Sequence, residues 1–383
     1  MKYVFKNRGN LILVAVFDAV GYSLFRLFRR AGHSPPPFHH ILVVRLDHLG
    51  DVLSSLGIPK AIKENFPNCK ITFLTSSWAS PLLLNNPFVD DVMVFDAPWF
   101  AKSRYAKDRQ ALGLGKLIPE LRKRNIDMVL GLRGDLRENI IFWLAGIGRR
   151  IGYGITGGGF LLTQEVPYEK GAHESAHLFR LLSVLGIKPQ TLVPHIYFSE
   201  REIAEFEKRI PVPGLPSDRR WVGFQVGAGA EAKEWPQENA NVFLEDFGKR
   251  FKDYQIALVG SDEKKASEIL SAHPRLSFVN LVNQTSLREL CLLIKKLKCF
   301  IGHDSGPTHL AAALGIRTVF LYSGTNLFEQ WRPLTEEAVV LRTPVPCSPC
   351  GLEFCNVPGH PCMTGISPAD VVSALEKLCL NTR

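Results

Sequence analysis

The sequence predicts an α/β protein built from two units, each with a parallel sheet, joined by a linker. The chain has 383 residues, which is too long for one ordinary domain and suits two of about 150 to 200 residues. Short apolar runs, typical of strands with both faces covered, alternate with helical patterns. A segment rich in proline and glycine, 189–216, interrupts this alternation before it begins again at Trp221.

The first unit begins at Ile41, where ILVVRL is a near-continuous apolar strand. A polar turn follows at 47–51, and then a helix over 52–66 with a bend at Pro59. Further strands are expected at 70–75, 92–95 and 127–131, and further helices at 78–84, 116–124, 136–146 and 173–185. This alternation is typical of a doubly wound, Rossmann-like sheet.

The second unit repeats the pattern after a linker that holds one short charged helix, 200–209. Strands are expected at 221–226, 255–259, 277–280, 298–301 and 317–322, and helices at 237–251, 263–270, 287–297 and 308–314. A last helix over 368–380 is expected to pack back across the junction. The expected boundaries are a leader at 1–38, domains at 39–200 and 201–365, and the final segment at 366–383. Two such domains predict a substrate cleft between them.

The stretch 302–324 has the pattern of a phosphate site, because an apolar strand runs into a polar turn and then a helix of small residues. Ser305, Gly306 and Thr308 surround the start of that helix, where free N–H groups and the helix dipole favour an anion. The crevice at the carboxyl ends of parallel strands is where such sheets bind ligands. The stretch therefore predicts a seat for a nucleotide diphosphate.

Two residues of this stretch keep alternative interpretations. Asp304 either caps the helix or holds a ligand hydroxyl. His309, in the first turn, is either a satisfied core residue or part of the site.

Two further residues have the right chemistry for catalysis but also ordinary structural explanations. Asp51 begins a helix at the carboxyl end of the first strand, so its carboxylate either caps backbone N–H groups or acts as a general base. Lys233 follows a glycine-containing loop, where it either balances phosphate charge or is a solvated lysine. Spacing alone leaves both questions open.

The charge of the chain is concentrated at its N-terminus. The formal net charge is +9, and residues 1–40 carry six Lys or Arg against Asp18, which is more than half of the excess. The remainder is close to balanced, which argues against a nucleic-acid partner with a broad basic face.

The apolar segment 11–28 predicts an N-terminal amphipathic helix bounded by basic residues. Arg26, Arg29 and Arg30 would share one helical face, which favours a helix lying on an anionic membrane surface. A helix packed on the protein's own surface and a membrane-spanning helix are the alternatives, although Asp18 interrupts the apolar run. No cleavage site for a signal peptide is evident, so a cytoplasmic protein is expected.

Half of the eight cysteines lie close together, as Cys347, Cys350, Cys355 and Cys362. Their spacing allows a metal site, a reducible disulfide or free thiols that shape a loop. The gaps after Cys350 are shorter than those of common zinc ribbons, and no metal or other cofactor is expected.

Several segments carry a family resemblance in their order along the chain. They are ILVVRLDHLGDVL (41–53), FLTSSWASPLLLNNPFVDDV (73–92), GLRGDLREN (131–139), RIGYGITGGGFLLTQEVPYEKGAHE (150–174), GAGAEAKEWP (227–236), GHDSGPTHLAAALGIRTVFLYSGTN (302–326) and CSPCGLEFCNVPGHPCMTGISPADV (347–371). Together they resemble the bacterial ADP-heptose:lipopolysaccharide heptosyltransferases, the family 9 glycosyltransferases, which have the two-domain GT-B fold. The resemblance covers about residues 41–380.

The resemblance implies transfer of heptose from ADP-heptose to the lipopolysaccharide inner core, with inversion at the anomeric carbon. It implies that Asp51 is the general base and that Lys233 supports the leaving diphosphate. The residues implied for the donor site are Asp304, Ser305, Gly306, Thr308, His309 and, by a loose match, Glu263. The residues implied for the acceptor site are Arg137 and His173.

The partners implied are an ADP-sugar, a lipid A–core oligosaccharide acceptor and, through residues 1–38, the cytoplasmic face of the inner membrane. A glycosyltransferase that uses another nucleotide sugar or glycolipid, and a non-catalytic nucleotide-sugar-binding protein, are the alternatives.

Overall fold

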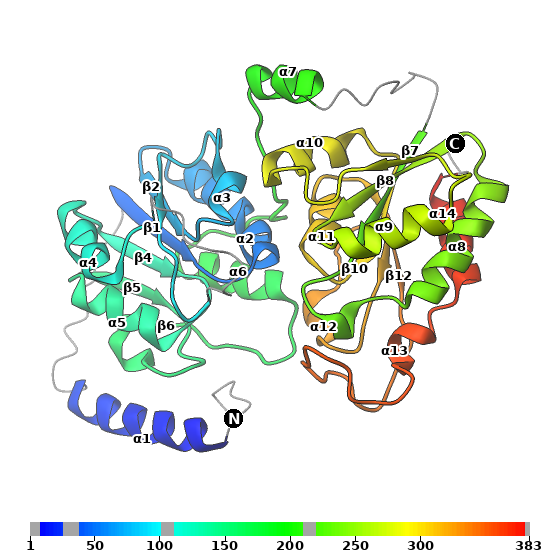
Figure 1. The fold of residues 1–383 in the computed structure, drawn as a ribbon. Helices are drawn as coiled ribbons and strands as arrows, with labels where there is room; N and C mark the ends of the chain where they lie inside the picture. The colour runs from blue at the N-terminus through cyan, green and yellow to red at the C-terminus, as the bar shows by residue number, and fades with distance from the viewer. Residues whose placement is uncertain (1–7, 26–37, 101–110, 210–219, 380–383) are drawn as a thin grey trace. The chain divides into compact units, whose positions relative to one another are not determined.

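A computed structural model describes residues 8–25, 38–100, 111–209 and 220–379 of the chain (Figure 1). Its contacts divide the chain into two compact units, Met1–Tyr197 (unit 1) and Phe198–Arg383 (unit 2). Each unit contains a six-stranded parallel sheet with helices around it. The predicted fold class of two Rossmann-like α/β units is therefore confirmed, whereas the finer domain boundaries and the cleft stay predictions.

Unit 1 orders its strands β3-β2-β1-β4-β5-β6. The strands are β1 (His40–Arg45), β2 (Lys70–Thr75), β3 (Asp91–Val94), β4 (Met128–Gly131), β5 (Arg149–Gly152) and β6 (Gln164–Glu165). The main helices are α2 (Leu49–Ser55), α3 (Gly57–Asn65), α4 (Leu114–Lys123), α5 (Leu136–Leu144) and α6 (Glu174–Ser183). Strands β1 to β3 extend the sheet toward one edge, and β4 to β6 extend it from β1 toward the other edge. The switch point is therefore between β1 and β4, and such sheets bind ligands there, outside the carboxyl ends of the strands.

Unit 2 repeats the same order from the opposite edge, β12-β11-β10-β7-β8-β9. The strands are β7 (Arg220–Val226), β8 (Tyr254–Gly260), β9 (Phe278–Asn280), β10 (Cys299–His303), β11 (Arg317–Leu321) and β12 (Ala338–Leu341). The helices are α7 (Glu200–Arg209), α8 (Gln237–Arg250), α9 (Glu263–Ala272), α10 (Leu287–Lys296), α11 (Gly306–Ala313), α12 (Phe328–Trp331), α13 (Pro361–Thr364) and α14 (Pro368–Cys379). Its switch point lies between β7 and β10.

Two predicted helices differ from the structure because of proline. The helix expected over 52–66 is two helices, since α2 ends at Ser55 and α3 begins at Gly57. Pro59 has no N–H to give to the carbonyl of Ser55, and its ring would clash there, so one continuous helix is excluded. The helix expected over 78–84 is a short 3₁₀ helix, η1 (Ser80–Leu83), with Pro81 in its first turn.

Three strands were not predicted, namely β5, β6 and β12. Each has four residues or fewer, and β5 and β6 begin with polar side chains. Such short strands, at or next to a sheet edge, carry little apolar pattern because few of their side chains reach the core.

The two helices that flank unit 2 in sequence both pack within it. Helix α7 meets α10 through the ion pairs Glu202–Arg288, Glu207–Lys296 and Arg209–Glu289. Helix α14 lies against α8 and also contacts β10, β11 and β12. The buried residues of α14, which include Val371 and Leu375, belong to the hydrophobic core of unit 2.

Helix α1 (Arg8–Phe25) is attached to unit 1 through one side. The buried carboxylate of Asp18 accepts a hydrogen bond from the Gly158 amide at 2.7 Å, and the Tyr22 hydroxyl donates to Glu165. Gly21 lies so close to the Phe160 ring that a Cβ would be 2.3 Å from it. These contacts fix which side of the helix faces unit 1.

The other side of α1 leaves large apolar side chains uncovered. Ile12, Leu13, Val16, Val20 and Leu24 are each more than half exposed. Among the residues that the structure describes, no helix is both long enough and apolar enough to cross a membrane. The expected basic face of Arg26, Arg29 and Arg30 lies outside the described residues, so a membrane-surface role stays a prediction.

Candidate functional site

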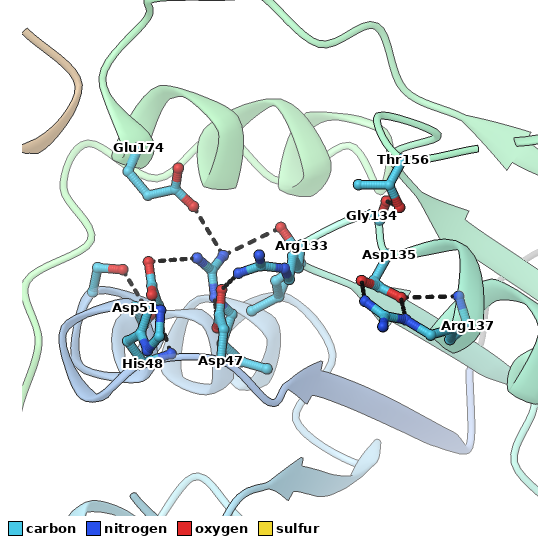
Figure 2. A network of polar contacts seen from close by, with 12 residues as sticks. Asp47, His48, Asp51, Arg133, Gly134, Asp135, Arg137, Thr156 and Glu174 are labelled. Carbon is cyan, nitrogen blue, oxygen red and sulfur yellow. Dashed lines mark hydrogen bonds and ion pairs between the residues drawn. The ribbon is translucent and has the colours of Figure 1, made fainter. Parts of the chain in front are cut away.

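Unit 1 holds a buried cluster of charged side chains at its switch point (Figure 2). Arg45, the last residue of β1, extends its guanidinium to Asp47 at 2.7 Å, Asp51 at 2.9 Å and Glu174 at 2.9 Å. None of these four side chains is more than 9% exposed. One cation is therefore shared by three carboxylates in a site that water hardly reaches.

Asp51 is both a capping residue and a member of this cluster. It lies in the first turn of α2, where Oδ2 accepts from the His48 amide at 3.2 Å and Oδ1 accepts from Arg45. The two interpretations that the sequence left open are therefore compatible. The cap holds the carboxylate in place, and the cluster sets its charge.

A second guanidinium, that of Arg133, follows β4 and pairs with Asp47. Burial alone would raise the pKa of Asp47, but Arg45 and Arg133 outweigh it and hold that pKa below its ordinary value. Burial raises the pKa of Asp51 to about 7, and the Asp47 carboxylate adds to the rise while Arg45 opposes it. Burial and the neighbouring Asp47 carboxylate thus allow Asp51 to exchange a proton near neutral pH.

The two residues expected on the acceptor side lie at the edge of this cluster. Arg137 pairs with Asp135, the N-cap of α5, and its guanidinium stacks 4.7 Å from the centre of the Trp99 ring. His173 is the N-cap of α6, where Nδ1 accepts from the Ser175 amide. Its position places the next residue, Glu174, against Arg45.

A second arginine also stacks on an aromatic ring in this region, because the Arg133 guanidinium lies 4.3 Å from the centre of the Phe100 ring. Arg133 and Arg137 are one third and one half exposed, respectively. The surface beside the cluster therefore combines two cations with two aromatic rings, a composition that suits an anionic carbohydrate.

Glu138 of α5 is a buried carboxyl group beside this cluster. It is 1% exposed, and neither of its oxygens has a hydrogen-bond partner in the part of the chain that the structure describes. Burial raises the pKa of Glu138 to about 8, and the Asp135 carboxylate adds to the rise. The group is therefore protonated at neutral pH.

Unit 2 shows the opposite arrangement, in which one carboxylate is shared by several donors. Asp304 follows β10 at the switch point and is 2% exposed. Its Oδ2 accepts from Lys233 at 3.1 Å and Asn326 at 2.7 Å, and its Oδ1 lies 3.0 Å from Nε2 of His309. Burial would raise the pKa of Asp304, but the bond from His309 and the charge of Lys233 lower it to about 2.

The structure thus brings together three residues that the sequence singled out separately, namely Lys233, Asp304 and His309. His309 is a member of this cluster and also touches the Phe320 ring edge-on. Lys233 donates to the Asp304 carbonyl at 2.9 Å in addition to its carboxylate bond. The Lys233 side chain is one fifth exposed, so it is held at the site and still reachable by a ligand.

The start of α11 is held by Gln225, the residue before the last of β7. The Ser305 and Thr308 hydroxyls both donate to the Gln225 side-chain oxygen, at 3.0 and 2.9 Å. Thr308 is fully buried, so its hydroxyl is engaged inside the protein, whereas Ser305 and Gly306 are half-buried at the helix end. The donor-site role of all three stays a prediction.

Glu263 lies apart from the Asp304 cluster. It is the first residue of α9, and its carboxylate accepts a hydrogen bond from the side-chain amide of Asn283 at 2.7 Å. The carboxylate that binds the glycine loop is that of Glu234, which accepts a hydrogen bond from the Ala228 backbone amide at 2.9 Å. Glu263 as a ribose ligand therefore stays a prediction on a loosely matched segment.

The four clustered cysteines, Cys347, Cys350, Cys355 and Cys362, are free thiols. Cys347 is exposed, and Cys362 is buried at the start of α13. Within the described residues, no three His, Cys, Asp or Glu side chains are grouped so as to hold a metal ion.

Sequence reasoning missed Arg45, Glu174 and Asn326 as site residues. All three stood in segments that carry the family resemblance, but none was given a role. Glu174 follows the predicted His173, and Asn326 lies just beyond the predicted phosphate stretch. Their positions at the end of β1, at the start of α6 and after β11 were the available signals.

Comparison with known proteins relates the chain to one enzyme family. Residues 114–359, more than half of the chain, match the family model described as glycosyltransferase family 9 (heptosyltransferase). Lipopolysaccharide heptosyltransferase 2 of Escherichia coli K12 is 26% identical over 329 residues, which cover 79% of this chain and 87% of the relative.

Solved structures share the fold. A family 9 glycosyltransferase from Veillonella parvula superimposes with a TM-score of 0.76 at 20% identity, covering 91% of this chain and 99% of its own. The ADP-heptose lps heptosyltransferase II of E. coli superimposes with a TM-score of 0.68 at 24% identity, covering 89% of this chain and 98% of its own.

The first prediction concerns proton exchange at Asp51. Glu174→Gln removes one negative neighbour and leaves Arg45 with two carboxylates instead of three, so the pKa of Asp51 should fall below about 7. Carboxyl ¹³C NMR titration would measure the shift. Glu169→Gln, which changes an exposed carboxylate paired with Arg180, should leave the Asp51 titration unaltered. An unchanged pKa in Glu174→Gln would show that the three carboxylates do not share Arg45.

The second prediction concerns Glu138 and stability. Its pKa is raised on folding, so the wild-type protein should lose stability relative to Glu138→Gln as pH rises from about 4.5 to 8. The two proteins should be similar near pH 4, and the variant should be more stable by on the order of 3 kcal/mol near pH 8. Urea unfolding at several pH values would measure this, and a difference independent of pH would contradict it.

Proposed function

The chain belongs to glycosyltransferase family 9, the heptosyltransferase family, and on that premise we propose that it transfers heptose from ADP-heptose to a lipopolysaccharide inner core. The observation that carries the proposal is the buried Asp51 carboxylate, which exchanges a proton near neutral pH at the switch point of unit 1. The names of the E. coli relative and of the E. coli solved structure support the sugar, the donor and the acceptor.

Asp51 acts as the general base in this proposal. It removes the proton from an acceptor hydroxyl, whose oxygen attacks the anomeric carbon of the heptose from the side opposite the ADP. The bond from that carbon to the ADP oxygen breaks, so the anomeric configuration inverts. A pKa of about 7 suits the task, because a base with a pKa near the working pH combines availability with basicity.

Lys233 and the start of α11 stabilise the departing ADP. Asp304, itself held by a hydrogen bond from Asn326, keeps the Lys233 ammonium in place before the ligand arrives, so little reorganisation is needed when charge develops on the diphosphate. The positive end of the α11 helix dipole, at Gly306, adds partial positive charge. These groups supply the countercharge from the protein alone, and we propose a metal-independent transfer.

The acceptor side is the surface formed by Arg133, Arg137, Trp99 and Phe100. Inner-core sugars carry anionic groups, and guanidinium groups bind such anions in a fixed geometry. Aromatic rings under the two guanidiniums limit their movement. His173 contributes by placing Glu174 in the Arg45 cluster.

Helix α1 attaches the enzyme to the cytoplasmic face of the inner membrane, where a lipid-linked acceptor lies. Its uncovered side carries five large apolar residues, and the sequence before and after it is basic. Apolar burial at the headgroup boundary and attraction to anionic lipids act together in such helices.

The deciding experiment is transfer by the purified protein, with ADP release as the readout. ADP-heptose, UDP-sugars and GDP-sugars would each be offered with a lipid A–Kdo acceptor. Selective release of ADP from ADP-heptose is expected. No release with any donor would contradict the proposed activity, and preference for another nucleotide would favour a transferase of different donor specificity.

Asp51→Asn tests the catalytic role. Asparagine has the same shape and can still accept from Arg45, but it is not a base, so kcat should fall roughly 100- to 10,000-fold. Affinity for ADP, measured by calorimetry, should not change, because ADP binds to unit 2 in this proposal. Asp246→Asn, at an exposed site on α8, is the matched control. Unchanged turnover would leave Asp51 with its capping role alone.

Vesicle co-sedimentation tests the membrane role of α1. Leu13→Ser with Val20→Ser should weaken binding to vesicles that contain anionic lipid, because both side chains lie on the uncovered side of the helix. Leu334→Ser with Val242→Ser removes equally exposed apolar side chains from unit 2 and is the control. Equal binding by both double variants would refute a lipid-facing α1.

A further inference from the structure

The segment that carries the four cysteines lies against the Asp304 cluster of unit 2. It runs from Cys347 to the start of α13 and has no regular secondary structure before Pro361. Its hydrogen bonds reach two other segments of unit 2 that are far away in sequence. One of these segments carries Lys233 and the other carries Asn326.

The first contact holds the residue before Lys233 on both sides. The Ala232 amide donates to the Glu353 carbonyl at 3.0 Å, and the Ala232 carbonyl lies 3.0 Å from Nε2 of His360. A carbonyl can only accept, so His360 is the donor and Nε2 carries the proton. Both backbone groups of buried Ala232 are therefore engaged by the cysteine segment.

The second contact holds the two residues before Asn326. The Cys350 amide donates to the Gly324 carbonyl at 3.0 Å, and the Gly351 amide donates to the Thr325 carbonyl at 2.9 Å. The Cys362 Cβ lies against Gly324 as well, 3.6 Å from where a Cβ on that glycine would be.

The two contacted segments have little regular structure of their own. Lys233 ends a single 3₁₀ turn, η3 (Glu231–Lys233), and Asn326 lies in the connection between β11 and α12. A single turn cannot fix its own orientation, because it closes too few hydrogen bonds. Yet the side chains of Lys233 and Asn326 meet on the same oxygen of Asp304.

We propose that the segment Cys350–His360 is a brace that positions Lys233 and Asn326 around Asp304, and that His360 is a positioning residue for Lys233. This inference rests on the proposed function, since it assigns the brace to the site that receives the ADP part of the donor. His360 does not touch the nucleotide. It acts through Ala232, whose carbonyl it holds, and thereby through the direction in which the next side chain leaves the backbone.

The test compares two substitutions at one backbone position. His360 has a positive φ of 48°, a backbone conformation that neither alanine nor glutamine favours, so the comparison between these two variants largely cancels the backbone strain. His360→Gln keeps an N–H donor of similar reach, whereas His360→Ala removes it. Loss of one such bond should weaken ADP binding and lower kcat/KM about three- to ten-fold in His360→Ala, and His360→Gln should restore most of both.

A double-mutant cycle separates positioning from general stability. If His360 acts through Lys233, then His360→Ala should have little further effect on ADP affinity once Lys233→Met is present. Phe354→Ser, at an exposed site in the same segment, is the control and should bind ADP as the wild type does. Thermal unfolding checks that each variant is folded. Should His360→Ala not fold, His360→Asn replaces it, because asparagine tolerates positive φ but is too short to reach Ala232.

The outcomes distinguish the brace from the proposed function. Wild-type protein that binds no ADP and transfers no sugar overturns the function and the brace with it. Active wild type with equal losses in His360→Ala and His360→Gln, or with additive losses in the cycle, overturns the brace alone. Rescue by glutamine and a non-additive cycle together support it.

Discussion

The Arg45 guanidinium in unit 1 is the interaction on which the rest of that site depends. A buried cation in contact with three carboxylates has its charge more than compensated, so the surplus negative charge has to be relieved by a proton. Asp47 keeps its charge because Arg133 is its second partner, whereas burial and the Asp47 carboxylate raise the pKa of Asp51. The reactivity of Asp51 is thus determined by its burial together with its charged neighbours.

Unit 2 has the complementary arrangement at the equivalent position of its sheet. There, a buried carboxylate at the equivalent switch point gathers donors from three segments, namely Lys233, His309 and Asn326. The pKa of about 2 at Asp304 keeps it charged, so it holds a cation where an anionic ligand is expected. Two sheets with the same strand order therefore present opposite electrostatic surroundings, one arranged to accept a proton and one arranged to hold positive charge.

The sequence was informative where the relevant pattern is local. Strands such as β1 and β10 are largely apolar runs, Asp304 follows β10 directly and Asp51 lies in the helix that follows β1, so both sites could be located. Arg45 could not be recognised as a site residue, because its meaning depends on Glu174, which is 129 positions away. Asn326 meets Asp304 only after β10 and β11 pair. The short strands β5 and β12 were missed for a related reason, since pairing and not apolar content defines them.

The positions of the two clusters and of the brace along the chain determine the order in which the two sites form during synthesis. Every residue of the Arg45 cluster lies between positions 45 and 174, so that cluster is complete in the nascent chain before any of unit 2 has been made. Domains generally fold in the order of their synthesis. The Asp304 cluster has all three of its donors once Asn326 is made, but the segment that holds Ala232 and Gly324 follows later. A newly made chain would therefore acquire its proton-accepting site first and its rigid cationic site last.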